Sequence, residues 1–555
     1  MKFRRIAPLV AGAAVAALLV SGCAAGGGTS ATGGDGAVLT VGMPNGTQTD
    51  NQSPFATGSS ALSLGYAFVI YEPLMMVNKA KPSDAPEPWL AESVTWNDDY
   101  TQAVITPRSG VKWSDGKDFT ADDIAFSIQL RKDNEAINTA ALPYGDITSD
   151  GSTVTVSFTE PQFVNQAKLY DLLIVPEHIW KDVKDPATDP NKKPVGTGPY
   201  TFKSWTPQAA TVVANPDYWG GKPAVPEIRY SSYNDNNALT TALTTGEAQW
   251  GWTFIADYEN VYIAKDPEHY HQFAAAGLGI DALFLNNETK PFNDKAFRQA
   301  LNMVLDRQQL VDVATSGVNP ALTNVTGLPL PAGEAYLSAD YQGDDYTVDV
   351  AGAKKLLTDA GYTYDGDKLV DPDGTPVTFT LTNPAGWNDY LTALDIIKTA
   401  AATIGATAEV QPANADGWFA DIIPPGDFQA SLHWTDGGST PYDMYSGIFN
   451  GAYYQPLGEA ANWNFGRFKN DEATAAFQTY ASTSDDAART EAMDTIQRIF
   501  VDEVPALAIW SRPSTAQYST KNYTGFPSED DPYNSAQPTG QQAAEIVMKL
   551  KPTGD

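Results

Sequence analysis

The stretch Gly110–Ile128, "GVKWSDGKDFTADDIAFSI", predicts a strand, a turn and a helix in quick succession. The strand ends in Trp-Ser-Asp-Gly, and the helix begins after Thr120. Thr120 is a suitable N-cap, and Asp123, three residues later, can complete a capping box by accepting from the N-cap backbone N–H. Ile124 and Ile128 lie four residues apart, on one face of the predicted helix. The stretch is therefore expected to form a strand followed by a capped helix.

Strand-like and helix-like segments alternate through the rest of the chain. The segments 37–43 and 151–160 alternate apolar and polar residues, which predicts strands. Residues 291–311 predict one long amphipathic helix capped by Asn293. Its apolar positions have helical spacing: Phe297, Ala300, Leu301, Val304 and Leu305. The alternation predicts an α/β fold, and no repeat of the solenoid or propeller type is present.

The first 23 residues predict a secretory signal. Lys2, Arg4 and Arg5 precede an apolar run, 6–20, that is too short to span a membrane comfortably. The run ends in "VSGC", which resembles a bacterial lipobox with Cys23 as the lipidated residue. Residues 24–36 are rich in Gly, Ser, Thr and Ala, so we expect a flexible tether. Two or more acyl chains on Cys23 would hold the protein to the outer face of the cell membrane.

The size and charge of the chain limit its function. A chain of 555 residues exceeds what one hydrophobic core supports, so several lobes are expected. It carries 67 acidic and 35 basic residues, a net charge of −32, which argues against nucleic acid and anionic lipid as partners. Its single cysteine excludes an intramolecular disulfide and a cysteine-based metal site.

Four segments resemble the solute-binding proteins of ABC importers, specifically family 5, the oligopeptide-binding type. They occur in the family's order across nearly the whole chain after the tether. They are Gly110–Ile128, then "GTGPYTF" (196–202) with "NPDYWGGKPAVPEI" (215–228), then "LTTGEAQW" (243–250), then "NNETKPFNDKAFRQALNMVLDRQQL" (286–310).

The resemblance implies a two-lobed, periplasmic-binding-protein-like fold with a hinge and an extra domain. It implies that ligand closes the lobes around itself, that the receptor serves a membrane permease, and that it acts as a monomer without cofactor or turnover. The expected division gives lobe I residues 37–75, 196–279 and 512–555. The extra domain then takes 76–195, and lobe II takes 280–511.

The loop Leu432–Tyr445, "LHWTDGGSTPYDMY", is expected to meet the ligand. By resemblance, peptide-binding relatives carry an acid three residues after the Trp and four before the Pro, where it pairs with the peptide α-ammonium. Here that position is Gly437, and Asp436 is displaced by one residue. A displacement of one residue in an extended segment turns the side chain to the other face. The loop looks more like the oligosaccharide-binding branch of the family.

Sugar rings have apolar faces that stack on aromatic rings and polar edges that take hydrogen bonds. Tryptophans in segments expected to line the cleft are therefore the candidate stacking residues, with Asp and Asn beside them for the hydroxyl groups. Trp250 and Trp252 should face one side of a strand, with Trp252 the candidate. The candidate ligand-binding residues are Trp252, Trp387, Asn388, Trp434, Asp436, Tyr442, Trp463 and Asn464.

Three other functions stay open. The first is the family default, an oligopeptide held by strand-like main-chain hydrogen bonds. The second is a metal carrier using His269 and His271, for which no third ligand is evident. The third is a glycoside hydrolase, which needs two carboxylates at a fixed separation. No catalytic motif stands out, so binding without turnover is expected.

Overall fold

The computed structural model describes residues 38–56, 58–82, 84–414 and 417–554. The predicted signal, Cys23 and the tether lie outside the described residues. In the described part of the chain, no helix is both long and apolar enough to cross a bilayer.

The first lobe is built on a seven-stranded sheet of order β12-β20-β11-β1-β10-β9-β8. β1 runs parallel to both of its neighbours, β10 and β11, and the other pairs are antiparallel. The strands are β1 (Leu39–Met43), β8 (Tyr200–Thr206), β9 (Ala209–Ala214), β10 (Glu227–Ser232), β11 (Trp250–Gly251), β12 (Tyr270–Ala275) and β20 (Ser514–Ser519).

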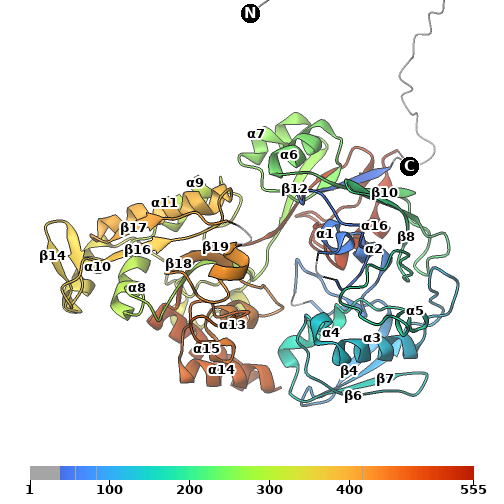
Figure 1. The fold of residues 1–555 in the computed structure, drawn as a ribbon, viewed down its shortest axis with the longest axis horizontal. Helices are drawn as coiled ribbons and strands as arrows, with labels where there is room; N and C mark the ends of the chain where they lie inside the picture. The colour runs from blue at the N-terminus through green and yellow to red at the C-terminus, as the bar shows by residue number, and fades with distance from the viewer. Residues whose placement is uncertain (1–37, 57, 83, 415–416, 555) are drawn as a thin grey trace, which may run out of the picture.

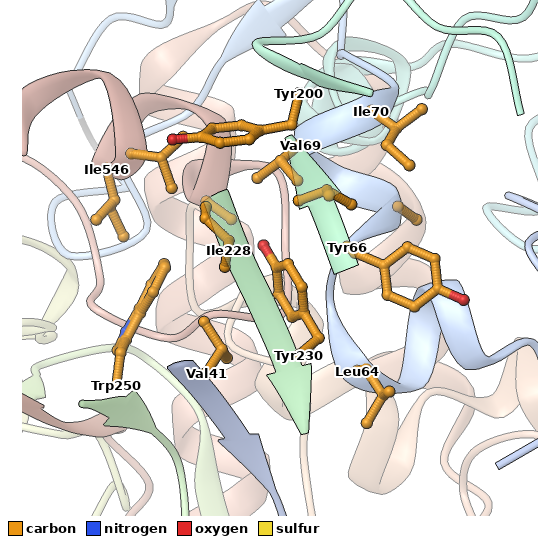
Figure 2. Close-up of a cluster of buried hydrophobic side chains, with 14 of the residues drawn as sticks. Val41, Leu64, Tyr66, Val69, Ile70, Tyr200, Ile228, Tyr230, Trp250 and Ile546 are labelled. Atoms are coloured by element: carbon orange, nitrogen blue, oxygen red, sulfur yellow. The ribbon is translucent and has the colours of Figure 1, made fainter. Parts of the chain in front are cut away.

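Helices cover this sheet and bury its aromatic residues. The helices are α1 (Ser60–Leu64), α2 (Ala67–Ile70), α6 (Asn236–Thr245), α7 (Tyr258–Val261) and α16 (Gln542–Lys549). Figure 2 shows Tyr230 and Ile228 of β10 with Val41 of β1, between Trp250 and Tyr66. Tyr200, Val69 and Ile546 extend the cluster to α2 and α16.

The second lobe is built on a five-stranded sheet of order β17-β16-β18-β13-β19. Its strand β13, which lies between β18 and β19, is buried along its whole length, and its side chains alternate between two cores. Leu283 and Leu285 enter one core, and Ile280, Ala282 and Phe284 enter the other. The strands are β13 (Ile280–Leu285), β16 (Thr378–Leu381), β17 (Thr407–Val410), β18 (Ala430–Trp434) and β19 (Ala506–Ser511).

Two groups of helices cover the two faces of this sheet. The first group packs on the core that holds Leu283, and the second on the core that holds Phe284. The first group is α8 (Lys295–Asn302), α9 (Arg307–Ala314), α10 (Val350–Asp359) and α11 (Asn388–Thr403). The second is α13 (Tyr442–Phe449), α14 (Asp471–Ser482) and α15 (Asp486–Glu503).

The extra domain has a four-stranded antiparallel sheet of order β4-β5-β7-β6 with its own hydrophobic core. Its elements are β4 (Ala91–Trp96), β5 (Gln102–Pro107), α3 (Ala121–Asp133), β6 (Tyr144–Ser149), β7 (Val154–Phe158), α4 (Gln166–Tyr170) and α5 (Glu177–Trp180). The predicted capping box is present, since Asp123 Oδ2 accepts from the Thr120 backbone N–H at 3.0 Å.

The predicted single helix over 291–311 is wrong in its length. The chain forms α8, breaks at Met303, and begins α9 after Asp306, whose side chain caps it by accepting from Gln309 N–H at 2.9 Å. Asp294, not Asn293, caps α8. The apolar positions keep helical spacing across the break because both helices pack on the same core, so the pattern hides the interruption.

The two lobes are joined by two crossovers. Residues 276–279 connect β12 to β13, and residues 512–513 connect β19 to β20. The backbone N–H of Arg512 donates to the carbonyl of Gly279 at 2.9 Å, so the crossovers lie side by side. Figure 1 shows the lobe of β13–β19 on the left, and the lobe of β8–β12 above the extra domain on the right. This arrangement is the two-lobed fold that was expected.

Candidate functional site

A cleft of about 1390 Å³ lies between the lobes and the extra domain. Its walls come from all three bodies and from both crossovers. The residues that matter below are Lys168 and Asp171 of the extra domain, Trp252 and Phe254 of the first lobe, and Trp387, Asn388, Asp389, Phe419, Trp434, Asp436 and Asp443 of the second lobe, with Gly279 and Arg512 at the crossovers.

Three aromatic rings form one surface on the second lobe's wall. We call Trp387, Phe419 and Trp434 the aromatic platform. Their ring centroids lie 5.8–6.3 Å apart: 5.8 Å for Trp387–Phe419, 6.1 Å for Phe419–Trp434 and 6.3 Å for Trp387–Trp434. Each also contacts the fully buried Trp418, which supports the platform from behind. Phe419 is 48% exposed, which is unusual for so large an apolar ring.

Local structure holds Trp434 in this position. It is the last residue of β18, paired with Asp281 of β13. The buried His433 stacks on it at 4.1 Å and on Trp418 at 5.3 Å. Burial lowers the pKa of His433 to about 4, so the imidazole is neutral at physiological pH and packs as an apolar ring. The Arg512 guanidinium lies over Trp434, 5.0 Å from the ring centroid, which permits a cation–π contact.

The two glycines of the loop occupy closely packed positions. A Cβ on Gly437 would lie 3.1 Å from the Gly279 backbone nitrogen, so the loop lies directly on the first crossover. Gly438 has φ +59°, and the Asp443 carboxylate occupies the space that a side chain there would need. The position at which peptide-binding relatives are expected to carry their acid therefore packs closely on the crossover backbone while it also lines the cleft.

Three carboxylates that line the cleft have a raised pKa: Asp389, Asp436 and Asp443. Enclosure by the walls raises the pKa of Asp436, and Lys168 and Arg512 partly oppose this. Burial raises the pKa of Asp443 to about 6, although Lys168 Nζ lies 3.9 Å from Asp443 Oδ1. Burial likewise raises the pKa of Asp389.

Asp281 lies at the base of the cleft beside the crossovers and is 3% exposed. Trp510 Nε1 donates to its Oδ2 at 2.6 Å, and Arg512 Nε lies 3.8 Å from Oδ1. Burial raises its pKa, and Arg512 partly compensates. Arg512 thereby connects the buried carboxylate, the crossover and the aromatic platform.

The first lobe's wall contains Trp252 and Phe254, but not Trp250. The prediction that both tryptophans face one side is wrong. β11 ends at Gly251, so the alternation stops before Trp252. Trp250 is fully buried and donates from Nε1 to the Ala536 carbonyl at 2.6 Å, whereas Trp252 is half-buried in the cleft wall.

The structure brings five of the eight predicted site residues to the cleft: Trp252, Trp387, Asn388, Trp434 and Asp436. It places the other three, Tyr442, Trp463 and Asn464, outside the described cleft lining.

Packing in the second lobe's core explains those three positions. Tyr442 stacks on Tyr480 at 5.8 Å. Trp463 covers Gly447 and contacts Phe465 at 5.8 Å. Asn464 is fully buried, with φ +50°; its Oδ1 accepts from the Phe468 backbone N–H at 2.9 Å, so it shapes a turn.

Among the cleft residues that were not foreseen from the sequence are Lys168, Phe419, Asp443 and Arg512. Trp418 and Phe419 form an adjacent aromatic pair, which is a signal that sequence reasoning could have used. Lys168 and Arg512 are single charges, on the short helix α4 and on a crossover, and only the tertiary structure brings them to the cleft.

The histidine pair has local partners. His269 Nδ1 lies 2.8 Å from Asp266 Oδ1, and His271 Nε2 lies 3.1 Å from Thr520 Oγ1. Across the described residues, no group of three or more His, Cys, Asp or Glu side chains is placed to hold a metal ion.

Comparisons with known proteins agree on one family. The model of bacterial extracellular solute-binding proteins, family 5 (middle), matches residues 85–455. The glutathione-binding protein GsiB of Salmonella typhimurium is 28% identical over 79% of this chain and 82% of its own length. The oligopeptide-binding protein AppA of Bacillus subtilis is 27% identical over 80% of each chain.

Solved structures show the same fold. The periplasmic oligopeptide-binding protein of an oligopeptide ABC transporter from Thermotoga maritima superposes with a TM-score of 0.82 at 23% identity, covering 93% of this chain and 99% of its own. A structure of that protein with bound mannohexaose superposes with a TM-score of 0.78, also at 23% identity, covering 94% and 100%.

Proposed function

Because the chain belongs to family 5 of the bacterial extracellular solute-binding proteins, it is the extracytoplasmic substrate-binding component of an ABC importer, and we propose that its solute is a short oligosaccharide. The ligand would lie in the cleft, between the aromatic platform and the wall that carries Trp252. Asn388 and Asp436 would serve the hydroxyl edges of the sugar rings.

The aromatic platform is the observation that carries this proposal. Three neighbouring rings, inclined to one another by 42–67° and supported by a fourth, present an apolar surface of ring faces and edges to a solvent-accessible cleft. Such a surface suits the apolar face of a pyranose ring, and aromatic side chains order with little loss of conformational freedom. The mannohexaose complex of the Thermotoga maritima protein shows that this fold can hold an oligosaccharide.

The packing of Gly437 supports a ligand without an anchored α-ammonium. The Cβ of an acid at this position would lie 3.1 Å from the Gly279 backbone nitrogen, so the anchor expected in peptide-binding relatives would require the crossover to shift slightly. Asp436 faces the cleft instead, and it can accept hydrogen bonds from hydroxyl groups.

A calorimetric titration with a matched panel tests the proposal. Mannohexaose and cellohexaose form one arm; glutathione and an unmodified nonapeptide form the other. We expect binding in the sugar arm alone. Binding of the nonapeptide, lost when its amino terminus is acetylated, would contradict the oligosaccharide assignment and leave the receptor role intact.

An oligopeptide is the second candidate. It is favoured by the glutathione- and oligopeptide-binding relatives and by the carboxylates Asp389 and Asp436, which face the cleft. A peptide α-ammonium would then pair with Asp436, so Asp436→Asn would abolish nonapeptide binding. The same variant would weaken oligosaccharide binding only by the value of one hydrogen bond, on the order of 1–3 kcal/mol.

We further propose that Cys23 carries the lipid that anchors the receptor to the outer face of the cell membrane. The basic start, short apolar run and "VSGC" sequence support this. Cys23→Ala should release the protein into the medium, and mass spectrometry should find acyl chains on the wild-type protein alone. Wild-type protein without an acyl group would contradict the anchor.

The division of the chain into lobe I (37–75, 196–279, 512–555), extra domain (76–195) and lobe II (280–511) is also proposed, with the monomer as the acting form. The proposed receptor binds without turnover. Incubation with cello-oligosaccharides should leave their lengths unchanged, and shorter products would overturn this point.

A further inference from the structure

The extra domain is fastened to the first lobe by a buried carboxylate. Glu72 is fully buried and accepts three hydrogen bonds. One comes from the extra domain, Trp89 Nε1 at 2.7 Å. Two come from the first lobe: Tyr218 Oη at 2.6 Å and Trp219 Nε1 at 3.0 Å. A buried carboxylate that loses its hydrogen-bond donors is strongly destabilised. These three bonds therefore hold the first lobe and the extra domain in one arrangement.

A second set of hydrogen bonds and an ion pair links the first lobe to the extra domain at Lys79 and Asp171. Lys79 pairs with Asp171 within the extra domain, and Lys79 N–H donates to Asn534 Oδ1 of the C-terminal segment at 2.8 Å. Gln541 Nε2 donates to the Asp171 carbonyl at 2.9 Å. The first lobe and the extra domain therefore act as one jaw, with the second lobe as the other.

The extra domain also touches the second lobe, at a place remote from the crossovers in sequence. The contact is made by the 3₁₀ turn η2 (Phe163–Asn165) and by α4. The Arg489 guanidinium lies over the Phe163 ring at 3.8 Å, and the Tyr480 ring meets it edge-on at 6.3 Å. Val164 is buried in the hydrophobic cluster of the second lobe. We call the contacts of Phe163, Val164 and Lys168 with the second lobe the clasp.

Lys168 completes the clasp inside the cleft. Its Nζ lies 3.9 Å from Oδ1 of Asp443, at the start of α13. Val164, Ala167 and Lys168 all line the cleft, and the crossover residues line it too. In Figure 1 α4 faces α13 and α14 in the lower half, whereas the strands that cross between the lobes lie in the upper half. The cleft thus has a covalent hinge on one side and a noncovalent clasp on the other.

We propose that the clasp is a closing device: the extra domain docks on α13–α15 and holds the two jaws together. Opening the jaws about the crossovers must separate Phe163 from Arg489 and Tyr480, expose Val164 to water and part Lys168 from Asp443. Each of these changes opposes opening, so the extra domain favours the closed receptor directly. The device depends on the receptor architecture alone and does not depend on whether the solute is a sugar or a peptide.

Small-angle X-ray scattering of the purified, dialysed protein tests the clasp. The wild-type curve should fit the described structure. The double variant Phe163→Ala/Lys168→Ala should show a larger radius of gyration, because the jaws swing apart. Arg489→Ala removes only the Arg489–Phe163 contact, from the second lobe's side, so it should shift the radius of gyration in the same direction by a smaller amount. Adding Arg489→Ala to Phe163→Ala should open the molecule no further, since both remove one contact.

Lys112→Ala is the matched control, because Lys112 pairs with Asp118 on the exposed surface of the extra domain, outside the clasp. It should leave the scattering curve unchanged. Melting temperatures establish that each variant is folded, and Arg489→Ala replaces the double variant if the latter is not. A wild-type curve that already fits an open shape, or identical curves for wild type and clasp variants, would overturn the proposal.

Discussion

At position 437 the chain packs closely on the first crossover, where a side chain would meet the backbone. The loop passes so close to the first crossover that a Cβ would meet the Gly279 nitrogen at 3.1 Å. The neighbouring Asp436 lines the cleft, and the Asp443 carboxylate fills the space above Gly438. Single residues here set which carboxylates are available to a ligand, and two predictions belong to this scale.

The first prediction concerns the stacking surface. Trp434→Ala should weaken binding of the solute that the panel identifies by roughly 1–3 kcal/mol, because a ring of the aromatic platform is removed. Trp463→Ala is the matched control, since Trp463 packs behind the cleft on Gly447. Its loss should lower stability and leave affinity unchanged. Calorimetric titration measures both, and equal affinities of wild type and Trp434→Ala would exclude the stacking role.

The second prediction concerns pH. The pKa of Asp443 is raised by burial to about 6 in the folded protein, above its ordinary value of 3.8. The folded protein therefore holds this proton more tightly than the unfolded chain. The resulting stabilisation is complete below about pH 4. It is lost as pH rises through about 6.

Asp443→Asn removes this titration. The stability of the variant relative to wild type should therefore increase between pH 4.5 and pH 7.5, by on the order of 2–3 kcal/mol. Denaturant unfolding at the two pH values measures it. A stability difference that is independent of pH would show that Asp443 ionises normally.

At the scale of elements, short-range signals placed the starts of helices better than their lengths. Thr120 and Asp123 form the predicted capping box, but Asp123 also accepts from Trp113 Nε1 at 3.3 Å and from Glu177 N–H at 3.0 Å. One carboxylate thus joins Trp113, α3 and α5. The strand predicted before the Trp-Ser-Asp-Gly turn is wrong, since residues 110–120 form only an isolated bridge between Lys112 and Asp118. Within Gly110–Ile128, Trp113 and Thr120 both donate hydrogen bonds to Asp123, so the turn and the start of α3 are held together.

Asp123→Ala should accordingly destabilise the protein more than an ordinary cap substitution does. We expect roughly 2–4 kcal/mol, because several donors lose their acceptor in a mostly buried place, against about 1 kcal/mol for Thr120→Ala. Asp122→Ala is the control, since Asp122 lies exposed in the same turn. Denaturant unfolding gives all three values. Equal effects of Asp122→Ala and Asp123→Ala would contradict this account of the network.

At the scale of the whole molecule, residues of both lobes and of the extra domain line the cleft, so a ligand that fills the cleft would touch all three. Saturating solute should therefore raise the melting temperatures of both lobes and the extra domain together. At a solute concentration of 100 times the Kd, the free energy of unfolding should increase by about 2.7 kcal/mol. Differential scanning calorimetry with and without solute measures this. A shift of one transition while another stays fixed would mean that the solute binds to one lobe alone.

The amino-acid sequence by itself determined the class of fold, the family and the helix cap at Thr120–Asp123, and five of the eight residues that it proposed for the site line the cleft. These depend on local periodicity, on hydrogen bonds between near neighbours and on motifs in a fixed order. Tryptophan identity alone could not separate Trp434 from Trp463, since a large apolar ring suits a cleft wall and a core equally well.

Only the tertiary structure decided the rest. Contacts between distant segments explain three features. They are the break between α8 and α9, the burial of Trp250 beside a cleft-lining Trp252, and the presence of Lys168 and Arg512 in the cleft. Lys168 meets Asp443 across 275 residues of sequence because the extra domain is fastened to the first lobe and reaches the second. No local pattern records such a meeting, since it arises from how separately folded bodies pack.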